Sequence, residues 1–126
     1  MSKNRQSGFT AVELLITLFV AAAFLVAGYQ LYTVVIKDGA NTRAQSRASN
    51  VAYDYMRRYS PTVASPCAAS TPLVNAPISV SNLSAVLVNV TLTCPYATVT
   101  SITKVTVTIT YNNPQQTMIY STYVKK

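Results

Sequence analysis

The chain lacks the residues on which most enzyme and metal sites depend. Its 126 residues include no histidine, three acids and three glycines, and no acid follows Asp54. General acid–base catalysis needs positioned titratable groups, and a metal site after residue 54 would have neither imidazole nor carboxylate ligands. The sequence contains no phosphate-binding glycine loop, and it has only three glycines in all. We therefore expect no enzymatic activity, no metal site and no cofactor.

Acids are scarce beside bases, and the formal net charge is +7. Basic proteins bind nucleic acids or anionic lipids through simple electrostatics. The basic residues are scattered, apart from the pairs Arg57-Arg58 and Lys125-Lys126. Two readings stay open: a solvated basic surface, which we favour, and a site where these cations and tyrosines grip single-stranded DNA.

Only two cysteines are present, Cys67 and Cys94, so one intramolecular disulfide is the most that can form. If this part of the chain is exported, the pairing is expected. It would close a loop of 28 residues and stabilise the fold by about 3–4 kcal/mol. The alternative is two reduced cysteines that are buried as small apolar residues.

One long apolar run spans residues 9–36 and follows a polar, basic stretch, MSKNRQSG. As a helix it would be about 42 Å long, enough to cross a bilayer with some tilt. Lys3 and Arg5 precede the run, so the positive-inside rule places the C-terminal part outside. An uncleaved signal anchor and a signal peptide cut within the run, for instance after Ala23, remain alternatives.

Glu13 is the only charged residue in this run. A carboxylate inside a membrane helix costs up to about 2.5–3.5 kcal/mol at the bilayer centre and less near an end, so it needs a partner. If the chain is cut after Gly8, the free amine of Phe9 on one copy would lie at the depth of Glu13 on its neighbour. Thr10 would add a hydrogen bond. The alternative is a glutamate that stabilises the helix N-terminus through the dipole.

Residues 8–15, Gly-Phe-Thr-Ala-Val-Glu-Leu-Leu, resemble the class III signal of type IV prepilins and pseudopilins. The resemblance implies that a membrane peptidase cuts after Gly8 and that Phe9 becomes an N-methylated N-terminus. It also implies that Glu13, assisted by Thr10, sets the registry between subunits. Residues 1–8 would be the cleaved leader of the short-leader type. The similarity covers about the first 35 residues.

The resemblance further implies partners and a location. The partners would be the prepilin peptidase, the assembly platform with its ATPase, and other copies of the chain in a helical filament. The chain would first lie in the cytoplasmic membrane, as a single-pass protein with its C-terminus outside. After assembly it would lie in an extracellular pilus that serves adhesion, twitching motility or DNA uptake.

The helical pattern continues after residue 36. A small or apolar residue recurs every three or four positions, and Ser60-Pro61 ends the pattern. A helix over residues 9–59 would be about 77 Å long, whereas a domain of this size has a radius of gyration of about 13 Å. The apolar half would therefore protrude. The stripe expected to pack on the rest of the chain is Ala40, Ala44, Ala48, Val51, Ala52, Tyr55 and Tyr59.

Residues 61–126 are expected to form a globular head. Residues 60–77 contain four of the six prolines and predict an irregular connection, with a short edge strand at 78–80. Alternating β-branched residues predict strands over 86–94, 105–111 and 117–124. The predicted fold is α+β: a long N-terminal helix whose second half, residues 37–60, packs on an antiparallel sheet of three or four strands, as in the pilin ladle fold.

Two further functions compete with a pilus subunit. A pseudopilin of a type II secretion or competence system would share the whole N-terminal pattern. A DNA-binding minor pilin would use the basic and tyrosine residues. Loops at 61–77 and 95–103 are the stretches that we expect to carry any variable receptor surface.

Overall fold

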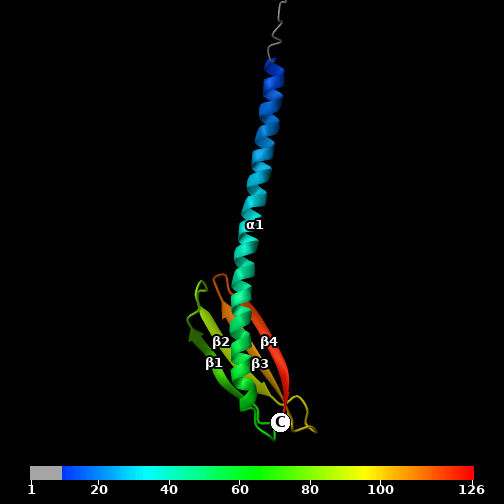
Figure 1. Ribbon diagram of the computed structural model, residues 1–126, viewed down its shortest axis with the longest axis vertical. Coiled ribbons are helices and arrows are strands. Elements are labelled where there is room, and N and C mark those ends of the chain that lie inside the picture. Colours follow the sequence, from blue (N-terminus) through cyan, green and yellow to red (C-terminus); the bar gives the residue numbers. More distant parts are fainter. Residues whose placement is uncertain (1–9) are drawn as a thin grey trace, which may run out of the picture. The chain divides into compact units, whose positions relative to one another are not determined.

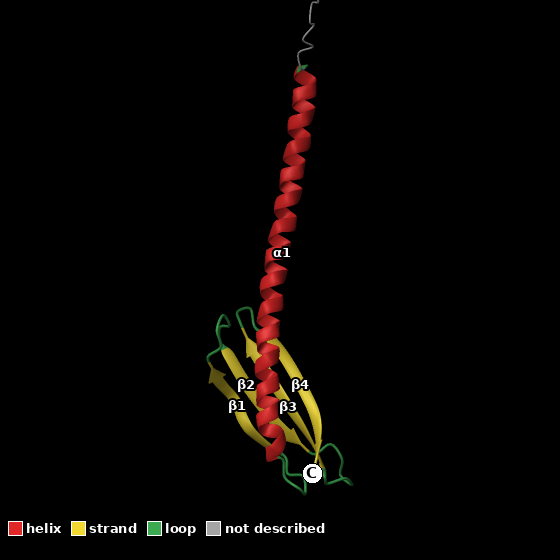
Figure 2. Ribbon diagram, viewed as in Figure 1, coloured by secondary structure: helices red, strands yellow, loops and turns green. Residues whose placement is uncertain are grey.

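The computed structural model describes residues 10–126, which form an α+β structure with one long helix and one antiparallel sheet (Figures 1 and 2). Helix α1 spans Ala11–Tyr59, and a short 3-10 helix, η1, follows it at Ser60–Thr62. The strands are β1 (Ser70–Ile78), β2 (Val86–Thr93), β3 (Ile102–Tyr111) and β4 (Gln116–Lys125). The chain divides into two compact units, one that ends at Ala40 and one that spans Asn41–Lys126.

In the second unit, residues 41–59 of α1 lie along one face of the sheet (Figure 1). The strand order is β1-β2-β3-β4, and every neighbouring pair is antiparallel. The sheet is thus a simple meander with β1 and β4 at its edges. Short loops join consecutive strands, as expected when each strand pairs with the next one in the sequence.

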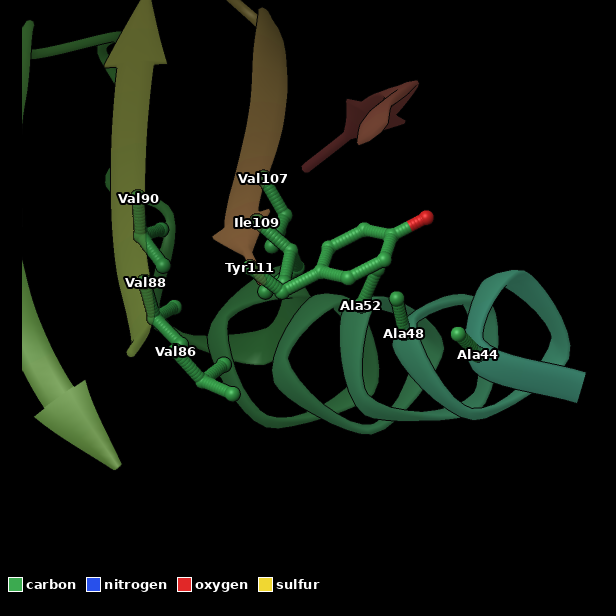
Figure 3. Packing of buried hydrophobic residues seen from close by; sticks show 9 residues of the cluster. All are labelled: Ala44, Ala48, Ala52, Val86, Val88, Val90, Val107, Ile109 and Tyr111. Atoms are coloured by element: carbon green, nitrogen blue, oxygen red, sulfur yellow. The ribbon is translucent and has the colours of Figure 1, made fainter. Parts of the chain in front are cut away.

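The core of this unit lies between the helix and the two central strands. Three alanines of α1 face apolar side chains of β2 and β3 (Figure 3). Alanine has no side chain beyond Cβ, so the helix backbone can approach the sheet closely. The buried members of this cluster are Ala44, Ala48, Ala52, Val86, Val88, Val90, Val107, Ile109 and Tyr111.

The predicted helical stripe is confirmed over most of its length. Its alanines at 44, 48 and 52 are buried, and Val51, Tyr55 and Tyr59 pack against the core cluster. Ala40 is exposed and does not take part. Tyr53, which lies off this stripe, is 57% exposed.

The three predicted strands are present, with small shifts at their ends. Burial alternates along β2 and β3 as the sequence predicts. Strand β2 ends at Thr93, so Cys94 lies outside it and is exposed. Strand β3 begins at Ile102, three residues earlier than expected, and this extension buries Thr103.

The prediction of an irregular connection over residues 60–77 is wrong for its second half. Residues from Ser70 onward form β1, which also replaces the short strand expected at 78–80. The strand tolerates Pro72 and Pro77 because it lies at an edge, where a missing backbone donor need not break a ladder. Its register shifts twice, and Asn75 adopts a positive φ of 47°. These irregularities hide the period-two pattern.

The close approach of α1 to the sheet yields a test. Ala48 is fully buried, so Ala48→Leu should force the helix away from β2 and β3 and lower the free energy of unfolding by about 1–3 kcal/mol. Urea denaturation of the full chain in detergent, followed by near-UV circular dichroism, measures the loss. Asn50→Leu, at an exposed position of the same helix, is the control. Equal stability of the two variants would contradict the packing described.

Candidate membrane and assembly segment

Helix α1 begins with a side-chain cap. The Glu13 amide donates to the Thr10 hydroxyl oxygen at 3.3 Å, and the Leu14 amide donates to the Thr10 carbonyl oxygen at 3.1 Å. Thr10 is therefore the N-cap residue, and Glu13 occupies the third helical position, where the spacing matches a capping box. The two residues predicted to act together in registry thus lie within one turn of helix. Gly8 and Phe9 lie outside the described residues.

The carboxylate of Glu13 is exposed. No other side chain within residues 10–126 bonds to it. Its position in the first turn favours a negative charge through the helix dipole.

The two threonines in the apolar segment have hydrogen-bond partners for their side chains, because each hydroxyl donates to a carbonyl oxygen within the helix. Thr17 donates to the carbonyl oxygens of Glu13 and Leu14, both at 2.9 Å, and Thr33 donates to that of Gln30 at 2.8 Å.

Residues 11–36 form an uncovered apolar surface. Every large hydrophobic side chain from Val12 to Ile36 is at least 45% exposed. The described part of the chain contains one helix long and apolar enough to cross a membrane, and this segment is its apolar part, with none of it buried. A helix that is apolar on all sides requires lipid or other apolar helices as surroundings. A signal sequence near an N-terminus satisfies the same criteria of length and composition.

The predicted disulfide is confirmed. Cys67 and Cys94 are bonded, with their Cα atoms 5.9 Å apart. The Cys67 amide also donates to the Thr100 carbonyl oxygen at 2.7 Å. The connection after η1 is therefore held to the loop between β2 and β3 by a covalent bond and a hydrogen bond. The alternative of two reduced, buried cysteines is wrong.

Further contacts at the same end of the unit fix the C-terminus. The Lys126 amide donates to the Ser101 carbonyl oxygen at 3.0 Å, and its ammonium donates to the Pro61 carbonyl oxygen at 2.9 Å. Within the Lys125-Lys126 pair, Lys126 is therefore held by hydrogen bonds inside the unit.

Both expected receptor loops are shorter than predicted, because residues 70–77 belong to β1 and residues 102–103 belong to β3.

Two cation–aromatic pairs lie in the second unit. The guanidinium of Arg58 lies 5.3 Å from the ring centre of Tyr55, which stacks on Tyr59. The ammonium of Lys104 lies 6.0 Å from the ring centre of Tyr123, which lies directly across the β3–β4 pair. Tyr123 is 58% exposed, so this second pair faces solvent.

Sequence reasoning missed a link between α1 and the β1–β2 loop. Arg47 donates to the Ser81 carbonyl oxygen at 2.8 Å, and the Asn82 amide oxygen, in the orientation that satisfies its hydrogen bonds, accepts from the same guanidinium at 2.6 Å. Ser84 and Asn112 in turn exchange hydrogen bonds between two loops. The only signal in the sequence was an arginine off the apolar stripe, and its partners are more than thirty residues away.

Comparisons with models of protein families, with curated proteins and with solved structures find no match to this chain. The functional argument therefore depends on the residues and contacts described above.

Proposed function

We propose that this chain is a structural subunit of a type IV pilus-like filament, assembled through the apolar segment of α1. The observation that carries the proposal is the exposure of residues 11–36, which have no cover within the described part of the chain. Two environments supply that cover: a bilayer before assembly, and a bundle of the same helices afterwards. Cleavage after Gly8 would leave Phe9 and the cap residue Thr10 at the start of this helix.

Glu13 is the residue that we propose to fix subunit registry. Inside a helix bundle its charge is costly unless a cation or strong donors are nearby. The amine of Phe9 on a neighbouring copy would supply the cation. The Thr10 hydroxyl already accepts from the Glu13 backbone, so its own proton remains available as a donor. The proposed partners are the prepilin peptidase, the assembly platform and its ATPase, with the head exported to the outside.

The mature N-terminus tests the proposal directly. Surface fibres are sheared from cells, and the subunit is analysed by N-terminal mass spectrometry. We expect the first residue to be an N-methylated Phe9. A chain that begins at Met1 would support an uncleaved membrane anchor, and a start within residues 11–36 would support an ordinary signal peptide. Either result, or fibres without this chain, would contradict the proposal.

The registry role of Glu13 is tested by Glu13→Gln. The substitution keeps the size of the side chain and leaves the Thr10 cap intact, because the cap uses the Glu13 backbone amide. We expect normal membrane insertion but at least a tenfold loss of filament yield, since a neutral amide can accept a hydrogen bond from the Phe9 amine but cannot neutralise its charge. Filaments are quantified in sheared fractions, and the membrane pool is measured by immunoblot.

Thr17→Val is the matched control for that experiment. It changes a polar residue one turn later, whose hydroxyl bonds only within its own helix. Filament yield should remain close to that of the unaltered chain. If Glu13→Gln assembles as well as Thr17→Val, the registry role is wrong.

A pseudopilin of a type II secretion or competence system would present the same apolar segment, and the length of its filament would distinguish it. A DNA-binding minor pilin is favoured by one observation, the exposed pair of Lys104 and Tyr123 in a unit with seven basic residues and one acid. A cation beside an exposed ring is the arrangement that grips single-stranded DNA.

A gel shift with the full chain in detergent tests the DNA alternative. Binding should weaken steeply as salt rises, and Tyr123→Ala should reduce it several-fold because a stacking base loses about 1–3 kcal/mol. Tyr53→Ala, at an exposed tyrosine on α1, should leave binding unchanged. Absence of binding at low salt would eliminate this function.

A further inference from the structure

The two edges of the sheet are built differently. Strand β1 contains Pro72 and Pro77, which have no backbone donor, and its register shifts twice. Asn75 within it adopts a positive φ. Such features interrupt the row of donors and acceptors that a further strand would need, and they are common protections of an edge.

Strand β4 has none of these protections. It pairs with β3 through ten consecutive residue pairs without a shift, contains no proline and carries one charge, Lys125. Among residues 10–126, no strand pairs with its outer side. About half of its backbone N–H and C=O groups therefore point outward, since the direction alternates along an antiparallel strand. A long, regular edge of this kind is a template for another chain.

The helix flank beside β4 is uncharged. A groove of about 270 Å³ lies between them, lined by Thr42, Gln45, Ser46 and Ser49 of α1 and by Met118 and Tyr120 of β4. The hydroxyl groups of Ser49 and Tyr120 are 2.7 Å apart and share a hydrogen bond. None of the four arginines of this unit lines the groove.

Charge selects the direction in which a second copy can pair with this edge. With seven basic residues and one acid, two copies of the unit repel each other wherever their cations face. Antiparallel pairing of β4 with β4 would keep the two Lys125 side chains about 30 Å apart, beyond the screening length of about 8 Å. Parallel pairing would place them about 5 Å apart.

We infer that two copies of this chain pair through β4 in antiparallel fashion and join their sheets into one of eight strands. The contact is isologous, with a two-fold axis that passes beside Tyr120, so that Thr117 of one copy lies opposite Tyr123 of the other. The uncharged grooves of both copies then meet at the junction. Because the axis preserves the faces of the sheet, the outward side chains of one copy, among them Thr117, Ile119 and Tyr123, lie opposite those of the other.

The symmetry also says which copies pair. The two-fold axis reverses the direction of residues 41–59 of α1, so the paired copies cannot be neighbours in a filament whose helices all point the same way. The interrupted donors and acceptors of the β1 edge likewise disfavour pairing of β4 in one subunit with β1 in the next subunit of the same filament. This last step rests on the proposed function: in such filaments, the β4 contact joins subunits of two filaments that run in opposite directions.

Cross-linking of the full chain in detergent micelles tests the pairing. Thr117→Cys and Tyr123→Cys place thiols at exposed positions on the same face of β4. A short bismaleimide should link the two variants when they are mixed. Each variant alone should give little dimer, because the same residue on the second copy is about 20 Å away. Dimers from the single variants without mixed dimers would overturn the inference.

An edge-blocking variant provides the second readout. Ile119→Lys changes a side chain that is 65% exposed, so the fold should persist, and it places two cations near the two-fold axis. We expect at least tenfold less mixed dimer. Val74→Lys adds the same charge on β1, at a residue that is 63% exposed, and should leave the yield unchanged. Higher salt should increase dimer formation by the unaltered β4 edge.

Dimers that survive Ile119→Lys, or that fall equally with Val74→Lys, would contradict the inference. These experiments use dispersed chains and need no filament. Failure of the cross-link together with a methylated Phe9 in surface fibres would reject the β4 contact alone. A mixed cross-link from a chain whose N-terminus is Met1 would reject the pilus function alone.

Discussion

The apolar side chains of residues 11–36 need cover that the described part of the chain does not provide. Sixteen large hydrophobic side chains lie between Val12 and Ile36, each at least 45% exposed. Fully burying one such side chain is worth about 1.5–3 kcal/mol. Because each of the sixteen already has part of its surface covered, covering the exposed remainder is worth on the order of 20 kcal/mol in total. That exceeds the 5–15 kcal/mol by which a typical domain is stable. The surroundings of this helix therefore dominate the energetics of the molecule.

Several polar groups in this segment are satisfied within the helix itself. Thr17 and Thr33 return their hydroxyls to carbonyl oxygens of the preceding turn. Thr10 satisfies one of the amides that every helix start leaves open. Glu13 keeps an exposed carboxylate, which favours the helix terminus but is costly in lipid. A partner from another chain would resolve that conflict, and this is why Glu13 is central to the proposed assembly.

The sequence was sufficient for most of the fold, and the reasons are local. Ser60-Pro61 marks the end of α1, and strict alternation of β-branched residues marks β2 and β3. Strand β1 was not predicted, because its prolines, its register shifts and Asn75 interrupt the alternation of side chains that identifies a strand. The hydrogen bonds of Arg47 were not predicted, because its partners lie in a loop distant in the sequence. For the candidate site, the sequence singled out Thr10 and Glu13, but the cap between them became visible only in the structure. A partner on another subunit lies beyond what one chain can show.

The central claim is that residues 11–36 are covered by lipid or by other helices and never by the chain itself. Sedimentation of the purified full-length chain, with and without detergent, tests it most directly. We expect a dispersed species only in detergent, and membranes or large assemblies without it. A soluble monomer in plain buffer, with residues 11–36 protected from hydrogen exchange by side chains of its own sheet, would contradict the claim.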